Sequence, residues 1–248
     1  MKKTFNSKLS ITVAGSLPNI SLLKTYLENN IIIIHVYGLT ETLGPHTVCE
    51  IRKDWKDLNS DELSKKISLQ GIPTIHGNFV SVLNSSKLPV KNNGMEIGEV
   101  LIKGNNLMEK YHNKPEITDK AFKSGFFHTG DLATIDENGY IEIKGRKKDI
   151  IISGGEKIPS GMLEQVIKEY KGILEVAIIP FHDKKWGESP HAIIQTRDNT
   201  KILKSEIFNF CKKRLPGFMV PKKITFDIIL KTATGKISKS LLIKKYIL

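Results

Sequence analysis

Five short stretches of the sequence combine glycine with hydroxyl or charged side chains at places where a plain scaffold would not need them. Glycine lets a ligand approach the backbone, and carboxylate oxygens suit a hard metal ion. The stretches are AGSLP (14–18), YGLTET (37–42), HTGDL (128–132), GRKKDIIISGGEKI (145–158) and KTATGKI (231–237). The last one contains Lys236, which is either a catalytic cation or one more solvated charge in a lysine-rich chain.

YGLTET directly follows IIIIHV, an apolar run that predicts a strand buried on both faces. An open α/β sheet places its ligand crevice outside the carboxyl ends of the strands. We therefore expect Thr40 to donate to a phosphate oxygen and Glu41 to bind magnesium. The alternative is a strand-to-helix turn, in which Thr40 caps a helix and Glu41 stabilises its positive N-terminus.

Asp131 and Arg146 are the next two side chains that the pattern singles out. Asp131 follows a glycine and precedes a hairpin, so it either binds the two hydroxyls of a ribose or is a turn aspartate that binds its own backbone. Arg146 is one of only four arginines, which indicates a position where the guanidinium fork serves a ribose or phosphate contact. An ordinary surface arginine is the alternative.

Gly154 and Gly155 come directly after the apolar run at 150–152. Two glycines where a strand ends predict a turn. Because glycine has no side chain, the same turn also allows another molecule to press against the backbone.

Composition narrows the classes of partner. The formal net charge of +12 would suit a nucleic acid, but the excess is lysine scattered along the chain, without arginine clusters or interleaved aromatic residues. We therefore expect no nucleic acid partner; the competing hypothesis of a noncatalytic nucleotide- or nucleic acid-binding module predicts steeply salt-dependent affinity. Cys49 and Cys211 match no metal or redox spacing, which favours the cytoplasm. No apolar run approaches the length of a membrane span, so stable membrane insertion is not expected.

Periodicity predicts an α/β chain of two parts. Apolar spacing indicates a helix over 18–30, a strand over 31–36 and a helix over about 60–69. Short apolar runs predict strands and turns over 71–145, including a hairpin over 132–143 whose turn residues Asn138 and Gly139 both have positive φ. Beyond Lys148, alternating helices and strands predict a small α+β domain with its own core.

Taken together and in this order, YGLTE, TGD, GR, GG and TGKI resemble the C-terminal half of the AMP-forming acyl-activating enzymes, which include acyl-CoA synthetases, luciferases and adenylation domains of peptide synthetases. The similarity runs from about residue 10 to the end. WGES (186–189) and TVCE (47–50) tilt it toward acyl-CoA synthetases. The resemblance implies that residues 1–147 are the C-terminal portion of the large adenylate-forming domain, a sheet end plus a small β-barrel-like subdomain. Residues 148–248 would form the mobile C-terminal domain.

The resemblance also implies roles for the motif residues toward ATP and magnesium. Thr40 would contact the α-phosphate and Glu41 would bind Mg2+. The residues expected to contact adenine and ribose are Gly15, Ser16, Leu17, Pro18, Tyr37, Gly38, Asp131 and Arg146.

In the small domain, Lys236 would bridge carboxylate and phosphate during adenylation of a small carboxylic acid, such as a fatty acid. Lys148 would be the hinge. After rotation about it, Gly154 and Gly155 would line the channel for the pantetheine arm of coenzyme A, whose thiol attacks the acyl-adenylate. A carrier protein bears the same arm and is the alternative acceptor.

One family feature is missing from the N-terminal region. The Ser/Thr/Gly-rich phosphate loop lies well upstream of YGLTE in relatives, whereas 36 residues precede Tyr37 here and contain no such stretch. We therefore expect a fragment, a truncated gene product or one half of a split pair, with a separate N-terminal half chain as a partner and little activity alone.

Overall fold

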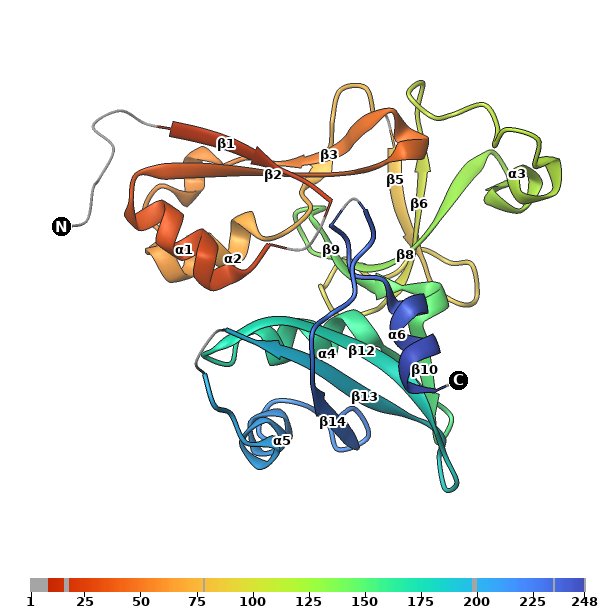
Figure 1. The fold of residues 1–248 in the computed structure, drawn as a ribbon. Helices are drawn as coiled ribbons and strands as arrows, with labels where there is room; N and C mark the ends of the chain where they lie inside the picture. Colours follow the sequence, from red (N-terminus) through yellow and green to blue (C-terminus); the bar gives the residue numbers. More distant parts are fainter. Residues whose placement is uncertain (1–8, 16–17, 78, 198–199, 234, 248) are drawn as a thin grey trace. The chain divides into compact units, whose positions relative to one another are not determined.

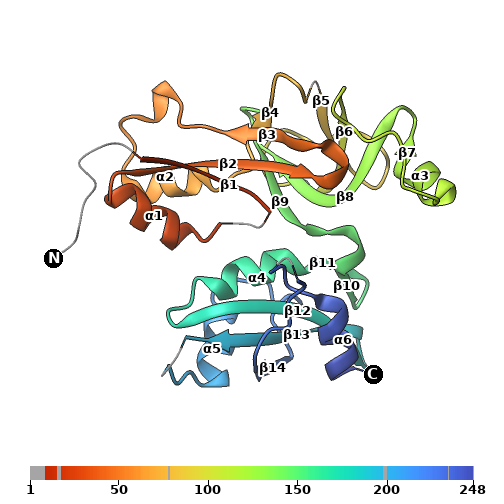
Figure 2. The same cartoon turned by 45° about the horizontal axis from the view of Figure 1, so that its top comes forward.

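The computed structural model describes residues 9–15, 18–77, 79–197, 200–233 and 235–247. The chain divides into two compact units, Met1–Ile143 and Lys144–Leu248, coloured red to green and green to blue in Figures 1 and 2. The second domain expected from residue 148 starts four residues after the second unit begins.

The first sheet of the first unit has the strand order β1-β2-β3-β4. Figure 1 labels the first three of these strands. Strands β1 and β2 are parallel, and the other two neighbouring pairs are antiparallel. The bounds are β1 Leu9–Val13, β2 Ile31–Leu39, β3 Gly44–Cys49 and β4 Ile72–Pro73. Helices α1 (Ile20–Glu28) and α2 (Ser60–Ile67) share a core with one face of this sheet.

The expectation that the strand over 31–36 is buried on both faces is wrong. Ile31 and Ile33 are buried beneath α1 and α2, but Ile32 and Ile34 are only half-buried. Successive side chains of a strand point to opposite faces, and both helices cover the same face.

Both covering helices begin at asparagine caps. The Asn19 side chain accepts from the backbone N–H of Ser21 at 2.8 Å. At α2, Asn59 accepts from the N–H of Glu62 at 3.0 Å while Glu62 accepts from the N–H of Asn59 at 3.2 Å, which is a capping box. Between them, the 3-10 turn η2 (Lys53–Trp55) places Trp55 in the core.

A second, antiparallel sheet completes the first unit, with the order β5-β6-β8-β7 and with β9 also paired to β8. Its bounds are β5 Phe79–Leu83, β6 Gly98–Lys103, β7 Phe122–Lys123, β8 Phe126–Ile135 and β9 Ile141–Arg146. This is the half-barrel expected at the end of an adenylate-forming large domain. Helix α3 (Pro115–Ala121) lies in the region for which the sequence predicted only strands and turns.

The hairpin predicted over 132–143 forms, but its turn differs from the prediction. Positive φ at both Asn138 and Gly139 is wrong, because only Gly139 (φ 81°) has it. The connection is longer than two residues, and the Asp136 carboxylate shapes it by accepting from the N–H groups of Asn138 (2.9 Å) and Tyr140 (2.8 Å).

The second unit contains the sheet β11-β10-β13-β12, with β14 paired to β13. Its strands are β10 Ile150–Ser153, β11 Glu156–Pro159, β12 Ile173–Asp183, β13 Gly187–Thr196 and β14 Lys223–Phe226. Its helices are α4 Ser160–Lys168, α5 Lys204–Lys212 and α6 Lys239–Tyr246, of which α6 was not predicted. The alternating helices and strands predicted beyond Lys148 are present.

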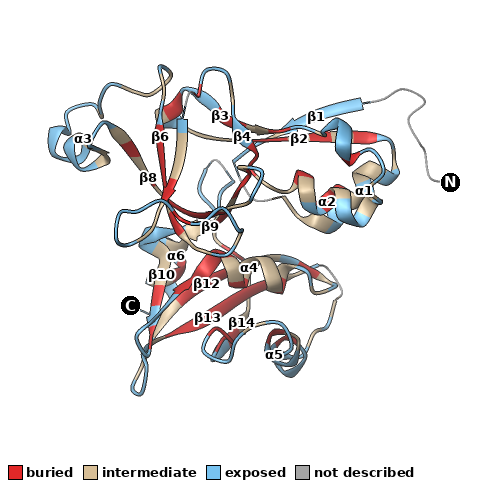
Figure 3. Ribbon diagram, turned by 180° about the vertical axis from the view of Figure 1, so that it is seen from behind, coloured by how far each residue is buried: buried red, intermediate tan, exposed pale blue. Residues whose placement is uncertain are grey.

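Alternation along β12 divides the apolar residues of the second unit between two cores. Figure 3 shows buried residues along β12 and β13. Val176 and Ile178 join the core with α4 and α5, whereas Ala177 and Ile179 join the core with α6. The sheet is therefore covered by helices on both faces. Among the helices in the described part of the chain, none is long and apolar enough to cross a membrane.

Candidate active site

Two predicted site segments leave the same edge of the first sheet. Val13 of β1 pairs in parallel with His35 of β2, so both strands have their carboxyl ends on one side. Gly15 (φ 89°) and Pro18 follow β1, while Ser16 and Leu17 lie outside the described residues. Tyr37 and Gly38 lie near the C-terminal end of β2, at this edge of the sheet. Ligands bind at this edge in an open α/β sheet.

The connection from β2 to β3 differs from the predicted alternative of a strand-to-helix turn. Thr40 begins a single 3-10 turn, η1 (Thr40–Thr42), and caps no helix, because Leu43 (φ 49°) and Gly44 (φ 128°) reverse the chain into antiparallel β3. The Thr42 hydroxyl accepts from the N–H of Leu39 at 2.9 Å and lies 2.6 Å from the carbonyl oxygen of Gly44. Thr40 itself is exposed.

Gly38 allows this connection to close. A Cβ added to Gly38 would lie 2.2 Å from the carbonyl oxygen of Gly44, which is far inside van der Waals contact. A side chain at this position would force the two strands apart.

Residues 106–111 hold the same connection from the side. The Tyr111 hydroxyl donates to Oε1 of Glu41 at 2.8 Å, and the N–H of Met108 donates to the Glu41 carbonyl at 2.7 Å. The Asn106 amide donates to the carbonyl of Thr42 at 2.8 Å. The Glu41 carboxylate is therefore fixed while remaining half-exposed.

The donor chemistry at Glu41 fits magnesium, which prefers carboxylate, phosphate and water oxygens. Within the described ranges, no three His, Cys, Asp or Glu side chains form a group that could hold a metal ion.

Tyr37 and Asp131 come together, although they were singled out in separate motifs. The Tyr37 hydroxyl donates to Oδ2 of Asp131 at 2.7 Å, and Asp131 is buried with 4% of its surface exposed. The alternative of a turn aspartate is wrong, because Asp131 lies within β8.

A bulge in β8 directs Asp131 to this position. Between the pairs Glu99–Leu132 and Leu101–His128, residues 129–131 oppose Val100 alone. The Thr129 hydroxyl fixes the bulge by donating to the carbonyl of Val100 at 2.8 Å and accepting from the N–H of Asp131 at 3.0 Å. The TGD motif is thus a local geometry that re-aims one carboxylate.

The remaining predicted site residues belong to the second unit. Arg146 ends β9 and is exposed. Lys148 lies in the 3-10 turn η3 (Lys147–Asp149), between β9 and β10, and is exposed as well.

Gly154 and Gly155 form the two-residue turn between β10 and β11, which confirms the predicted turn. Their φ values of 58° and 87° are both positive, the pattern of a type I′ hairpin. The N–H of Gly154 donates to the carbonyl of Trp186 at 2.8 Å, and a Cβ on Gly154 would lie 2.7 Å from the indole ring. Trp186 therefore covers one glycine of the pair.

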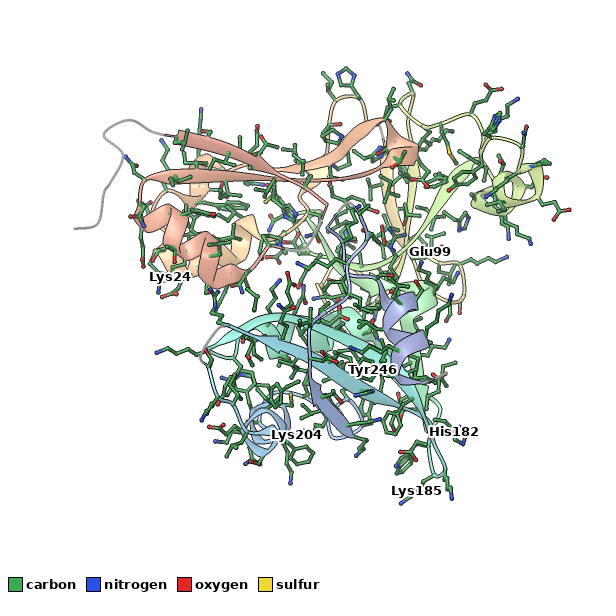
Figure 4. All side chains as sticks on the ribbon, in the orientation of Figure 1. Lys24, Glu99, His182, Lys185, Lys204 and Tyr246 are labelled. Atoms are coloured by element: carbon green, nitrogen blue, oxygen red, sulfur yellow. The ribbon has the colours of Figure 1, made fainter. Side chains whose placement is uncertain are left out.

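The loop between β12 and β13 carries Trp186. Asp183 fixes it by accepting from the N–H groups of Lys185 (2.9 Å) and Trp186 (3.1 Å) and from the hydroxyl of Ser189 (2.9 Å). The N–H of Lys185 and the Ser189 hydroxyl lower the pKa of Asp183. His182 and Lys185 mark this loop in Figure 4.

Lys236 lies between Lys231 and Ile237, which pair as an isolated bridge. The N–H of Thr232 donates to the Lys236 carbonyl at 2.7 Å, and the N–H of Lys236 donates to the Thr232 hydroxyl at 3.2 Å. Lys236 is exposed, and no side chain in the described part of the chain forms an ion pair with it. Its backbone is fixed and its ammonium is available.

Two family models match the chain. The AMP-binding enzyme model covers residues 1–112, and the AMP-binding enzyme C-terminal domain model covers residues 162–236. The chain therefore belongs to the AMP-binding enzyme family.

Curated relatives of this chain include CoA ligases. 4-Hydroxybutyrate–CoA ligase 2 of Metallosphaera sedula is 40% identical over 96% of this chain and 43% of that protein. Acetate–CoA ligase CCL3 of Humulus lupulus is 37% identical over 94% of this chain and 42% of that protein. The chain thus spans less than half the length of the curated relatives it matches.

Among solved structures, o-succinylbenzoate CoA synthetase of Bacillus subtilis in complex with its acyl-adenylate intermediate superposes with a TM-score of 0.80. It is 27% identical over 94% of this chain and 45% of that protein.

The sequence did not single out Tyr111, Thr129 or Lys239 as supporting residues. Tyr111 and Thr129 act through contacts with residues distant in sequence, Glu41 and Val100, which no local spacing reveals. Lys239 carried no such signal either, because the helix that it begins, α6, was not predicted.

Proposed function

We propose that this chain is the C-terminal part of an AMP-forming acid–thiol ligase that makes acyl-CoA from a small carboxylic acid, ATP and coenzyme A. The observation that carries the proposal is the hydrogen bond between Tyr37 and Asp131. It joins two motif residues 94 positions apart, close to the carboxyl edge of β1 and β2. Open α/β sheets bind their ligands at the carboxyl edge of the strands.

The first unit would bind the nucleotide. Asp131, held by Tyr37, would accept hydrogen bonds from the ribose hydroxyls, and Arg146 would also hold the ribose. The segment Gly15 to Pro18 would lie against adenine, and Thr40 would donate to the α-phosphate. Magnesium at Glu41 would neutralise phosphate charge during pyrophosphate release.

Lys236 would serve the adenylation step. That step brings an anionic carboxylate against an anionic α-phosphate, so a placed cation offsets repulsion and stabilises the charge that develops on the phosphorus. An ammonium on a backbone-fixed loop, unpaired with any described carboxylate, suits this role.

The second step would use another face of the same unit. Rotation about Lys148 would withdraw Lys236 and bring Gly154 and Gly155 to the site, where the thiol of coenzyme A attacks the acyl-adenylate and AMP leaves. Such a hinge motion gives one site two catalytic states.

We also propose a partner. The phosphate loop and most of the acid pocket would belong to an N-terminal part of the enzyme, proposed to be a separate half chain in the cytoplasm. This chain covers less than half of each relative, which supports the existence of such an N-terminal part.

Carboxylate-dependent exchange of pyrophosphate into ATP tests the proposal. The chain alone should give little exchange, and addition of a candidate N-terminal chain from the same genome should restore it. Lys236→Ala should abolish exchange in the mixture while sparing thioester formation from preformed acyl-AMP. Equal loss in both steps would contradict the role of Lys236, and robust exchange by the chain alone would remove the need for a partner.

A further inference from the structure

A partly buried cluster of charges lies where helix α6 begins. The ammonium of Lys239 lies 2.7 Å from Oε1 of Glu164, 2.6 Å from the hydroxyl of Ser160 and 3.8 Å from Oδ2 of Asp149. The side chains of the three charged residues are between 19% and 23% exposed. Glu164 also accepts from the N–H of Ile178 at 2.8 Å. The cluster therefore joins α4, β12, α6 and the turn η3.

Helix propensity alone does not explain a lysine at this position. Lys239 is the first residue of α6, where the N–H groups carry partial positive charge and a cation is disfavoured. The two carboxylates offset this cost. Burial raises the pKa of Glu164, and the ammonium of Lys239 acts in the opposite direction.

The two ends of this cluster lie next to the two moving parts of the proposed mechanism. Lys239 is three residues after Lys236, and Asp149 directly follows Lys148, the proposed hinge. The far end of α6 is held separately, because the Tyr246 hydroxyl, labelled in Figure 4, donates to Asp227. The other side of the lysine loop is held by Lys231, whose ammonium lies 2.8 Å from Glu175.

We propose that Lys239 is a positioning residue that links the catalytic lysine loop to the hinge, so that residues 231–238 follow the hinge turn η3 as one body. The proposal rests on the proposed function for the roles of Lys236 and Lys148. The link itself is a property of the chain. Because Lys239 contacts both Glu164 and Asp149, a change at either end of the cluster alters the other.

Hydrogen exchange of the full chain measures the link directly. In Lys239→Met, amides of 146–153 and of 230–238 should both exchange about tenfold faster, since a partly buried carboxylate pair loses its cation. Lys231→Met is the matched control and should accelerate 230–238 while leaving 146–153 unchanged. Lys239→Arg retains the charge and should restore wild-type rates at both segments.

Asp149→Asn keeps the proposal testable if Lys239→Met disrupts the whole unit. It removes one hinge carboxylate and should accelerate exchange at 230–238, although that segment is remote in sequence. Unchanged exchange at 146–153 in a folded Lys239→Met variant, or at 230–238 in Asp149→Asn, would overturn the link.

A kinetic measurement on the chain combined with its N-terminal partner separates the link from the proposed function. Lys239→Met should lower kcat for adenylation about tenfold with little change in KM for the acid, and Lys239→Arg should restore it. Coupled exchange without any adenylation would reject the proposed function and keep the link. Adenylation that is normal in Lys239→Met would reject the positioning role.

Discussion

The hydroxyl of Tyr37 on β2 donates a hydrogen bond to the buried carboxylate of Asp131 on β8, at 2.7 Å. The bond joins the two sheets of the first unit, because β2 and β8 belong to different sheets. The contact therefore contributes to the fold of this unit as well as to the proposed ribose site.

We expect Tyr37→Phe to destabilise the first unit by about 2 kcal/mol, because a buried carboxylate loses a hydrogen bond. Urea unfolding of Tyr37→Phe, Asp131→Asn and the double variant should give a coupling free energy of at least about 1 kcal/mol. Tyr26→Phe is the control, since the Tyr26 hydroxyl bonds to none of the described residues. A coupling near zero would show that the two side chains act independently.

Variants of Glu41 and Tyr111 should distinguish an effect on stability from an effect on magnesium-dependent adenylation. Glu41→Gln keeps an oxygen that accepts from Tyr111, so stability should change by less than about 0.5 kcal/mol, while the loss of charge lowers magnesium-dependent adenylation about tenfold or more in the assembled enzyme. Tyr111→Phe should cost about 1 kcal/mol of stability. Magnesium titrations and urea midpoints check both, and a normal magnesium response in Glu41→Gln would contradict the assignment.

The glycine pair of the β10–β11 turn offers a comparison between neighbours. Alanine at either position adopts an unfavourable positive φ, which costs about 1 kcal/mol. At Gly154 the new Cβ also meets the ring of Trp186 at 2.7 Å, whereas at Gly155 nothing lies within 4 Å. Thermal unfolding should therefore show a larger loss for Gly154→Ala, by about a further 1–2 kcal/mol. Equal losses would mean that Trp186 moves aside freely.

His191 predicts a loss of stability in mild acid. It is fully buried, and its Nδ1 has no hydrogen-bond partner among the described residues. Burial, together with repulsion from Lys223 and Lys204, lowers the pKa of His191 to about 4. Protonation therefore favours unfolding, so stability is complete above the usual histidine pKa of about 6.5 and falls as the pH drops toward 4.

The matched measurement is the free energy of unfolding against pH for wild type and His191→Gln. Between pH 6.5 and 4, the free energy of unfolding should fall by up to about 3 kcal/mol less in the variant than in the wild type. Lys245 and Tyr246 lower the pKa of Asp227 to about 2. Protonation of Asp227 should therefore continue the loss of stability below that range in both proteins. Identical slopes in both proteins between pH 6.5 and 4 would show that His191 does not titrate there.

Local patterns predicted much of the fold. Apolar spacing predicted α1 and α2, and the glycine pair predicted the turn between β10 and β11. Propensity did not distinguish a hairpin connection from a helix start at Thr40, because the reversal depends on φ at Leu43 and on the Gly38–Gly44 approach.

The sequence predicted the residues of the candidate site better than the contacts that hold these residues in place. The motif order identified Tyr37, Asp131 and Lys236, but not that Tyr37 holds Asp131, because that contact depends on a bulge between distant strands. The sequence did not distinguish Lys239 from the other lysines, because its role depends on its contacts with Glu164 and Asp149, which only the structure shows.

The chain has two tryptophans, and each unit contains one of them. Trp55 is 7% exposed in the core beside Tyr140, whereas Trp186 is 43% exposed against Gly154. The emission spectrum should therefore contain a short-wavelength component from the first unit and a long-wavelength component from the second. This native pair of fluorophores allows the melting of each unit to be followed in the unlabelled protein.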